Sequence, residues 1–482
     1  MIDLRPPAYT VGWLIAGLGA AMLIPWAVDT VYAPEARAGF LASALATFLF
    51  GAFLVISCAN TSGQRYSLQQ TFMLTSGVWI ILPIFGGLPF LANPQSGNVV
   101  NAYFEAMSGL TTTGATIFTD LDALSPGVKL WRGMLQWFGG VGIIVFAMVF
   151  LPELRVGGMQ IFRTEGFDTL GKILPRAVAI ARSVFSIYLI LTLACAVAYS
   201  IAGLGFFDAV VHAMTTLATG GFSNYDDSFA SLGAAAEYVG VTFMLLASLP
   251  FVRYVQLAAF DGQPLLRDPQ VRGFFIVIIM LVSALVLWRA LFITADFEAA
   301  FRKALFNGVS VMTGTGFASD NYMLWGSFPV ALLFFAGLIG GCAGSTTCSV
   351  KVFRYQLLFA AVRAQVKRLH VPHGVFHPRY AGQRVSDEVL SSVIAFFMVF
   401  LISLAVIAVL LGMTGLDMVT SISGAVAALC NIGPGLGPVI GPAGNYAALN
   451  DAAKWILAAA MLLGRLELMA VIVLFTRQFW RG

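Results

Sequence analysis

Four short glycine-containing segments of this chain combine residue types that could bind a dehydrated cation through backbone oxygen atoms. Because glycine readily adopts positive φ, successive carbonyl oxygens can turn toward one axis, as they do in an ion selectivity filter. None of the four segments contains Asp or Glu, which favours a monovalent cation, K⁺, over a divalent one. The predicted filter residues are Thr112, Thr113, Gly114, Thr219, Gly220, Gly221, Gly314, Thr315, Gly316, Asn431, Ile432 and Gly433.

The amino-acid composition indicates whether these segments lie in a soluble protein or in a membrane protein. Of 482 residues, 59% are hydrophobic and only 10% are charged, whereas soluble domains average about 25% charged residues. Many apolar stretches exceed the ~18 residues that cross a bilayer as a helix. The sequence therefore predicts an all-α polytopic membrane protein. Its five cysteines are scattered, which favours buried thiols over a disulfide framework.

A repeated order of elements surrounds the glycine segments. Two apolar segments, 11–27 and 40–57, come first, and then a long helix, a short helix, a glycine segment and a long helix follow one another four times. The expected long helices cover 69–91, 127–151, 182–201, 234–255, 273–292, 327–351, 388–411 and 452–478, and the short ones 98–110, 207–217, 297–311 and 417–429. The predicted units are two N-terminal helices (1–62) and pore repeats 63–165, 166–262, 263–370 and 371–482 with pseudo-four-fold symmetry.

The short helices are too short to cross a membrane. At 1.5 Å per residue they reach only about half of the bilayer, so we expect them to re-enter on the side where they began. Entering from outside, their partly negative C-terminal ends would face the centre of a pore and favour a cation. Irregular backbone at this depth is tolerated only where it is buried in protein or lines a water-filled cavity.

The charge distribution predicts the orientation. Most of the 27 Lys and Arg residues lie on one set of alternating connections, together with both termini. The positive-inside rule assigns that side, and hence both termini, to the cytoplasm. The opposite connections are poor in Lys and Arg but contain several Asp and Glu residues, and the four glycine segments lie on this outer side. Nothing in the charge pattern indicates a nucleic-acid partner.

A charge within the last long helix is the first candidate for control of the pore. Burying Arg465 in a membrane costs about 2.5–3.5 kcal/mol on insertion scales, so such a residue is functional by default. We expect a positive charge facing the pore below the filter, where it would limit leak. A buried ion pair is the alternative, although Glu467 at i+2 does not share a helix face with Arg465.

A glycine-rich interruption of the 327–351 helix is the second candidate. Its density of glycine argues against regular helix and predicts an unwound, mobile gate below the filter. A phosphate-binding loop is the alternative, but the Gly-Lys-Ser/Thr ending is missing. The predicted gating residues are Gly340, Gly341, Gly344, Ser345, Thr346 and Thr347, together with Arg465. A third group, His370, His373 and His377, lacks the Cys or carboxylate partners of a transition-metal site, and we predict none there.

These motifs together resemble the Trk/Ktr/HKT superfamily of potassium transporters. The likeness is carried by the four filter segments, by 431–437, by 340–347 and by 464–467, and it is strongest to TrkH, the membrane subunit of bacterial Trk uptake systems. The resemblance implies helix–pore-loop–helix repeats around one K⁺ pathway in each subunit of a homodimer in the bacterial inner membrane. It also implies a cytoplasmic TrkA-like regulatory ring that itself binds NAD(H) or ATP/ADP, so that this chain binds no cofactor. One departure is the Cys348-Ser349 pair, where the family pattern leads us to expect glycines and where we expect a stiffer loop end.

Two other functions are compatible with a polytopic membrane protein. An H⁺- or Na⁺-coupled potassium symporter would need a titratable carrier, and Glu105 and Glu467 are the intramembrane acids to consider. A membrane enzyme would need clustered acidic, His or nucleophilic residues at one membrane face, and the sequence has no such cluster. We therefore expect no enzyme and favour a channel-like pore.

Overall fold

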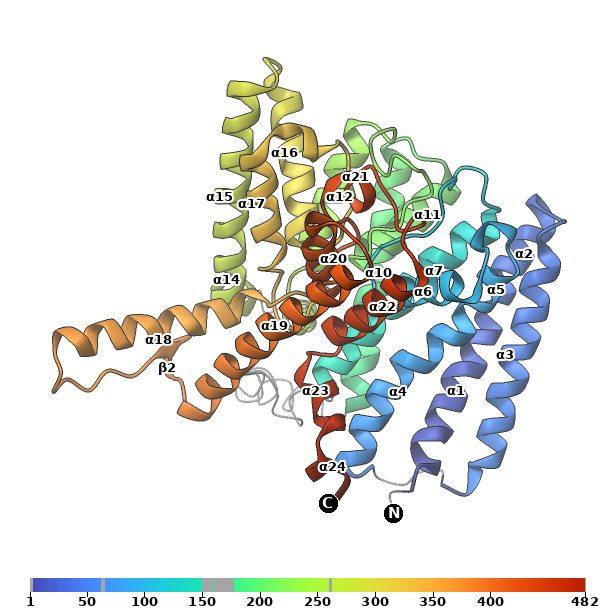
Figure 1. Cartoon of the computed structure of the whole chain (residues 1–482), viewed down its shortest axis with the longest axis horizontal. Helices are drawn as coiled ribbons and strands as arrows, with labels where there is room; N and C mark the ends of the chain where they lie inside the picture. Colours follow the sequence, from blue (N-terminus) through green and yellow to red (C-terminus); the bar gives the residue numbers. More distant parts are fainter. Residues whose placement is uncertain (1–2, 62–65, 150–157, 159–176, 260–261, 482) are drawn as a thin grey trace.

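The computed structural model describes residues 3–61, 66–149, 158, 177–259 and 262–481, and in these it is built almost entirely of helices (Figure 1). Six helices are long and apolar enough to cross a membrane, and the number within the described residues rises to eight if each of two bent helix pairs is one span. This architecture confirms the predicted all-α polytopic class. Most of the basic segment 155–182 and the end of the expected 127–151 helix lie outside the described residues.

The N-terminal unit forms one edge of the molecule (Figure 1). Small residues let its helices approach closely: a Cβ atom on Gly19 would lie 2.6 Å from the backbone nitrogen of Phe48 on the facing helix. Such close contacts replace the hydrophobic driving force that is missing between helices in lipid. The unit consists of α1 (Arg5–Ala21), α2 (Leu23–Tyr32) and α3 (Arg37–Ser57).

The first two repeats follow the expected order of helices. Repeat 1 contains α4 (Leu68–Gly86), α5 (Leu88–Leu91), α6 (Val99–Leu110) and α7 (Pro126–Val149). Repeat 2 contains α10 (Ala177–Ile201), α11 (Phe206–Leu217), α12 (Ala234–Ala247), and α13 (Phe251–Ala258). The short helices are α6 and α11, each of 12 residues, and both end at the centre of the molecule beside a glycine segment.

The other two repeats carry more breaks. Repeat 3 contains α14 (Gln263–Arg267), α15 (Pro269–Phe292), α16 (Phe297–Met312), α17 (Ser327–Gly337) and α18 (Val352–His370). Repeat 4 contains α19 (Asp387–Met413), α20 (Met418–Cys430), α21 (Gly437–Ile440), α22 (Asp451–Arg465), α23 (Met469–Ile472) and α24 (Arg477–Arg481). A two-stranded hairpin, β1 (Arg379–Tyr380) and β2 (Gln383–Arg384), joins them and was not expected.

Side-chain caps explain where three of the four short helices begin. Asn98, Asp296 and Asp417 each accept a hydrogen bond from a backbone amide of the first turn of α6, α16 and α20, respectively. These contacts satisfy amides that have no partner within the helix. The predicted starts of these short helices agree with the structure to within one residue.

Two predictions of single long helices were wrong. The expected 234–255 helix is broken into α12 and α13 with an angle of 89° between them, and the expected 452–478 helix is broken into α22 and α23 with an angle of 106°. Pro250 lies at the first break, where its ring cannot donate a backbone hydrogen bond. The second break occurs at Glu467 and Leu468, with φ of 61° and 24°. Arg465 consequently ends α22 rather than lying midway along a continuous helix.

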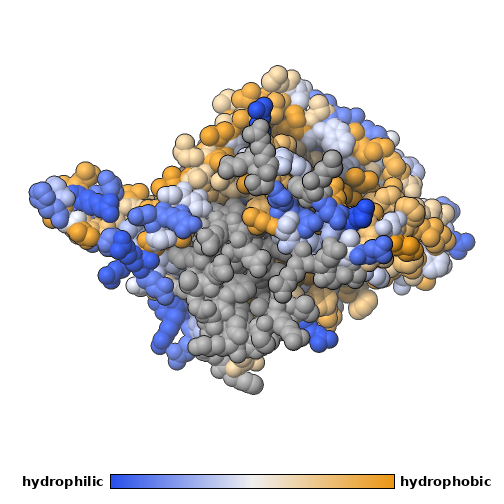
Figure 2. All heavy atoms as spheres, turned by 90° about the horizontal axis from the view of Figure 1, so that it is seen from below, coloured by the Kyte–Doolittle hydropathy of each residue, from blue (hydrophilic) through white to orange (hydrophobic). Residues whose placement is uncertain are grey.

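Helix α18 projects from the body of the molecule together with the β1–β2 hairpin (Figure 1). The side of the molecule that carries both chain ends shows hydrophilic side chains gathered on this arm (Figure 2). Arg363, Lys367 and Arg368 are exposed along α18. The arm therefore presents positive charge on the side that the charge distribution assigns to the cytoplasm.

The close packing of α1 on α3 generates a stability prediction. Gly19→Leu would push Phe48 away, and overpacking of this kind costs about 1–3 kcal/mol. We expect the midpoint temperature of thermal unfolding in detergent to fall. Fluorescence-detected gel filtration of heated samples measures this temperature. Gly17→Leu is the matched control, because a Cβ atom on Gly17 meets nothing within 4 Å. An equal loss of stability in both variants would contradict the packing argument.

Candidate ion pathway

The four glycine segments adopt one shared turn at the ends of the short helices. Thr112, Thr219, Gly314 and Asn431 occupy equivalent positions, and their φ values are 53°, 48°, 74° and 52°. A left-handed residue at this position ends a helix and lets the next amides bond back to its last carbonyls. The amide of Thr113, for example, donates to the Ser108 carbonyl at 2.8 Å. Equivalent bonds join Gly220 to Thr215 and Ile432 to Ala427.

Together the segments close into a ring. A Cβ atom on Gly114 would collide with the carbonyl oxygen of Gly220, and one on Gly221 would collide with the carbonyl oxygen of Thr315. A Cβ atom on Gly316 would lie 2.8 Å from the nitrogen of Gly433, and one on Gly433 would lie 2.8 Å from the carbonyl oxygen of Gly114. Each segment therefore contacts the next, and the fourth contacts the first.

The four ring glycines also line one cavity. Gly114, Gly221, Gly316 and Gly433 border a space of about 70 Å³, whose other walls come from residues that follow each glycine. Asp226 is the acidic residue in this lining, and burial raises its pKa above the usual carboxyl value. Two acidic residues of the outer connections instead form ion pairs: Asp320 pairs with Arg289, and Glu298 with Arg302.

One position of three of the short helices holds the chain beyond the ring glycine, and the sequence reasoning missed it. Glu105 accepts a hydrogen bond from the amide of Ile117 at 2.9 Å, and Asn307 accepts one from the amide of Ser319 at 3.2 Å. Both residues lie nine positions before their ring glycine. His212 lies at the same distance before Gly221 and contacts Ser223 Oγ at 3.1 Å. The fourth short helix departs from this spacing, because Ser423, which accepts from the amide of Leu436 at 2.9 Å, lies ten positions before Gly433. The signal was the constant spacing, which chemically different residue types concealed.

Glu105 forms a buried ion pair within repeat 1 that also contacts repeat 2. Its carboxylate accepts from Arg132 Nε at 2.8 Å, and both side chains are almost completely buried. Arg132 Nη1 also donates to the Ser223 carbonyl at 2.8 Å, and the guanidinium lies 4.1 Å from the centre of the Phe222 ring. The pair therefore joins the first and second filter segments.

Polar groups of the filter segments bond to one another and to neighbouring side chains. The hydroxyls of Thr111 and Thr113 are 2.8 Å apart, and those of Thr313 and Thr315 are also 2.8 Å apart. These threonines support the left-handed turns with their side chains. The Gly220 carbonyl accepts from Gln136, and the Gly433 carbonyl accepts from the Tyr446 hydroxyl. A carbonyl has two lone pairs, so each of these oxygens keeps one for a cation.

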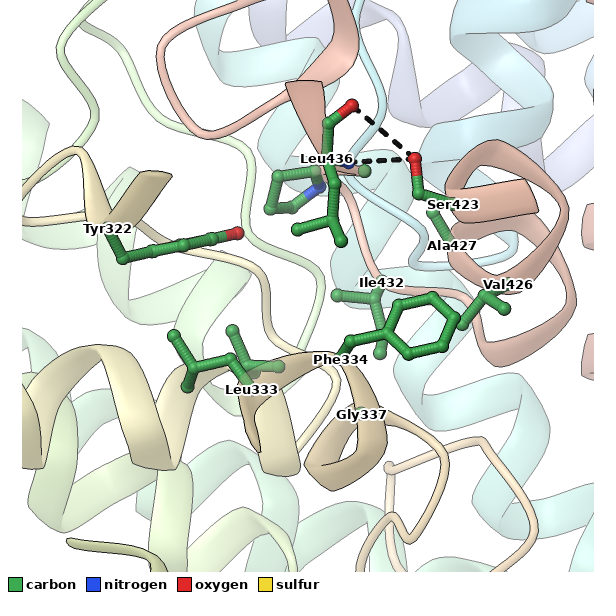
Figure 3. A pocket seen from close by; sticks show the side chains of 12 residues that line it. Tyr322, Leu333, Phe334, Gly337, Ser423, Val426, Ala427, Ile432 and Leu436 are labelled. Atoms are coloured by element: carbon green, nitrogen blue, oxygen red, sulfur yellow. Dashed lines mark hydrogen bonds between the residues drawn. The ribbon is translucent and has the colours of Figure 1, made fainter. Parts of the chain in front are cut away.

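The fourth segment differs most from the others. Ile432 occupies the position of Thr113, but its side chain turns away from the ring into an apolar pocket of about 30 Å³ beside Phe334 and Gly337 (Figure 3). Ile432 can therefore offer only backbone oxygen to the ring. Asn431 instead links the segments, because its Nδ2 donates to Thr113 Oγ1 and to the Met461 carbonyl, both at 3.0 Å.

Arg465 lies one helical turn beyond Met461 and spans from one repeat to another. Its Nη2 donates to the Gly139 carbonyl of α7 at 3.0 Å, while Nη1 donates to the Thr346 carbonyl at 3.2 Å and to Cys348 Sγ at 2.7 Å. None of these acceptors is a carboxylate. The alternative of an ion pair with Glu467 is wrong, because Glu467 bonds to Lys351 and Arg354.

The expected interruption of the 327–351 helix is present as a loop over 338–351. Its backbone bonds to the break between α12 and α13: the amide of Cys342 donates to the Ser248 carbonyl at 3.1 Å, and that of Thr346 to the Ala247 carbonyl at 3.3 Å. Because α12 ends there, these carbonyls have no partner within the helix. The break at Pro250 therefore creates the acceptors that hold the loop.

The end of this loop turns where glycines were expected. Ser349 and Lys351 adopt left-handed φ values of 63° and 75°. Ser349 Oγ donates to the Gly337 carbonyl at 2.8 Å, and the Lys351 amide donates to the Ile339 carbonyl at 2.8 Å. Hydrogen bonds thus hold a conformation that glycine would adopt without strain.

Comparison with known proteins agrees with this geometry. The family model described as "TrkH: Cation transport protein" matches residues 36–481. This chain belongs to the TrkH family of cation transport proteins. The family is one of transporters, which confirms that the chain is not an enzyme.

The similarity to individual proteins extends over the whole chain. It is 43% identical to the Trk system potassium uptake protein TrkI of Halomonas elongata, covering 97% of this chain and 95% of the relative. It is 36% identical to TrkH of Escherichia coli K12, covering 98% of each chain. The crystal structure of the potassium transporter TrkH from Vibrio parahaemolyticus superposes with a TM-score of 0.91 at 33% identity, covering 100% of both chains.

The ring contacts generate a prediction for Gly114. Both Gly114→Ala and Gly97→Ala place a side chain on a left-handed residue, with φ of 85° and 75°, at a cost of about 1–2 kcal/mol. Only the first collides with a neighbouring segment, since the nearest neighbour of a Cβ on Gly97 is 3.8 Å away. We expect Gly114→Ala to abolish discrimination between Rb⁺ and Na⁺ in proteoliposome flux. Gly97→Ala should retain it, and retention in both variants would contradict a close-packed ring.

Proposed function

We propose that this TrkH-family chain carries K⁺ into the cell through a channel-like pore whose selectivity filter is the ring of four glycine segments. The observation that carries the proposal is the closure of the ring, in which each glycine lies against the backbone of the next segment. The named relatives are potassium uptake proteins. The predicted filter residues supply backbone oxygens without a carboxylate, a set that suits a monovalent cation.

The short helices contribute to cation binding. All four end immediately before the ring, so their partly negative C-terminal ends lie beside the proposed ion pathway. In the first three segments the side chains nine residues before the ring glycine hold the following chain in place, and in the fourth Ser423 does so. The filter therefore offers a preorganised binding site without placing a full negative charge in the ring.

Control of the pore is assigned to Arg465 and the 338–351 loop. Arg465 connects α7 of repeat 1 to the loop of repeat 3, and thus lies across the region below the ring. Its charge opposes cation passage, and the loop obstructs the same region. Opening requires both to move.

A coupled symporter receives less support. Glu105 and Glu467, the two candidate carriers, each bond to arginine or lysine in buried surroundings. Both carboxylates hold neighbouring segments together through these contacts, which favours a structural role over that of a mobile carrier.

The assembly around the pore forms part of the same proposal. We infer a homodimer with one pathway per subunit in the bacterial inner membrane, with both termini in the cytoplasm. The α18 arm, with its exposed basic side chains, is the surface offered to a TrkA-like ring that binds the regulatory nucleotide. This chain itself needs no cofactor for that role.

Uncoupled transport has a direct test. Purified protein in liposomes should take up ⁸⁶Rb⁺ against trapped K⁺ with no pH or Na⁺ gradient, and a proton ionophore should leave the initial rate unchanged. Empty liposomes give the background. Uptake that appears only with an imposed pH or Na⁺ gradient would favour the symporter.

The role of Arg465 generates the next prediction. Arg465→Ala removes the charge below the filter and should raise cation flux in the absence of a cytoplasmic partner by about tenfold, equivalent to about 1.4 kcal/mol on the barrier. Arg465→Lys should remain close to the unsubstituted protein. The control is Arg289→Ala, which removes an arginine that is only 5% exposed and pairs with Asp320 away from the ring. An unchanged flux in folded Arg465→Ala protein would refute the assignment.

A further inference from the structure

A buried charge cluster joins the end of the 338–351 loop to the break in the last membrane helix. Lys351 Nζ donates to Glu467 Oε1 at 2.8 Å, and Arg354 Nη2 donates to Glu467 Oε2. The side chains of Lys351, Arg354 and Glu467 are 6%, 0% and 7% exposed. We call these three residues the Glu467 cluster. One carboxylate therefore binds two cations from a different repeat.

The backbone is strained on both sides of the cluster. Lys351 has φ of 75°, and Glu467 and Leu468 have φ of 61° and 24°. Left-handed conformations cost residues other than glycine about 1–2 kcal/mol each, so they persist only where other contacts stabilise them. Here the ion pairs connect the strained positions directly. Loss of the carboxylate would release both backbones at once.

Arg465 lies two residues before Glu467, so the same break positions both side chains. Arg465 holds the middle of the loop through Thr346 and Cys348, while Glu467 holds its end. The loop is thus attached to the last helix at two points. An arginine that must leave the pathway cannot move far while Glu467 remains bound to Lys351 and Arg354.

The cluster also lies at the base of the α18 arm. Lys351 precedes α18, and Arg354 lies in its first turn. Helix α18 has 19 residues and is about 28 Å long at 1.5 Å per residue. A force on the distal basic end would therefore be transmitted through a rigid helix to the two cations.

We propose that the Glu467 cluster is the positioning device that holds the pore closed, and that displacement of the α18 arm opens the pore by separating Lys351 and Arg354 from Glu467. The inference rests on the proposed channel function. It assigns to Glu467 a role in gating instead of proton transfer. It also explains how a cytoplasmic partner can act on Arg465 without touching it.

Glu467→Gln tests the proposal with two measurements. The first is ⁸⁶Rb⁺ flux of the full chain in liposomes without any partner. The second is the rate at which a methanethiosulfonate reagent modifies Cys348, with Cys58, Cys195, Cys342 and Cys430 replaced by Ala. Cys348 is 8% exposed beneath Arg465 and reports loop movement without requiring transport. We expect both rates to rise at least about fivefold, the lower end of typical coupling between sites.

The chain contains a matched control. Glu237 is also a buried carboxylate that binds two cations, Arg302 at 2.6 Å and Lys303 at 2.8 Å, but it joins α12 to α16 away from the loop. Glu237→Gln should leave Cys348 modification unchanged. Glu467→Asp keeps the charge and should remain closer to the unsubstituted protein than Glu467→Gln.

The remaining outcomes separate the two proposals. If Glu467→Gln fails to fold, Lys351→Met keeps the bond between Arg354 and Glu467 and should still raise both rates. Unchanged or slower Cys348 modification in folded Glu467→Gln and Lys351→Met protein would overturn the positioning role. If the unsubstituted protein and Arg465→Ala both carry no Rb⁺, the channel proposal fails, while Cys348 modification still tests the cluster.

Discussion

The structure depends on one constraint: backbone amides and carbonyls that end a helix inside a membrane must find partners in the protein. The short helices α6, α11, α16 and α20 all end at the centre of the molecule, and so does the broken helix α12. Their free carbonyls accept from amides of the left-handed turns, from side chains at the helix end such as Thr111, or from amides of the 338–351 loop. The filter segments and the 338–351 loop therefore both provide partners for backbone groups that the ended helices leave unbonded. In the proposed filter the remaining carbonyl lone pairs stay free for an ion, whereas below it the loop amides bond to the Ala247 and Ser248 carbonyls at the break between α12 and α13.

Buried charges then connect the repeats that the backbone alone leaves separate. Arg132, paired with Glu105 inside repeat 1, donates to the Ser223 carbonyl of repeat 2. Glu237 with Arg302 and Lys303 links repeats 2 and 3, and Glu467 with Lys351 and Arg354 links repeats 3 and 4. Burying ions is costly unless they are paired, so each cluster specifies how its repeats fit together. Arg465 is different, since it bonds to two carbonyls and a thiol. Our proposal places this charge beside the path of a moving ion.

The predictions from sequence succeeded where a pattern is local. The truncated short helices and their glycine segments follow from length, apolar runs and glycine, and the structure places their starts and turns close to the expected residues. The breaks at 248–250 and 466–468 were missed, because an apolar run through a bent helix pair looks like one span. The position that braces the filter was also missed: Glu105, His212 and Asn307 share a spacing but have different chemistry.

The sequence by itself determined that the chain is an all-α membrane protein and predicted four related units, because hydropathy, charge and glycine spacing act on each segment independently of its neighbours. Only the tertiary structure decided that the four segments close into one ring, that Arg465 reaches Gly139 and Thr346, and that Glu467 binds Lys351 and Arg354. The physical reason is distance along the chain. Contacts between residues more than 100 positions apart leave no periodic signal in the sequence, and they form only when helices from different repeats pack together.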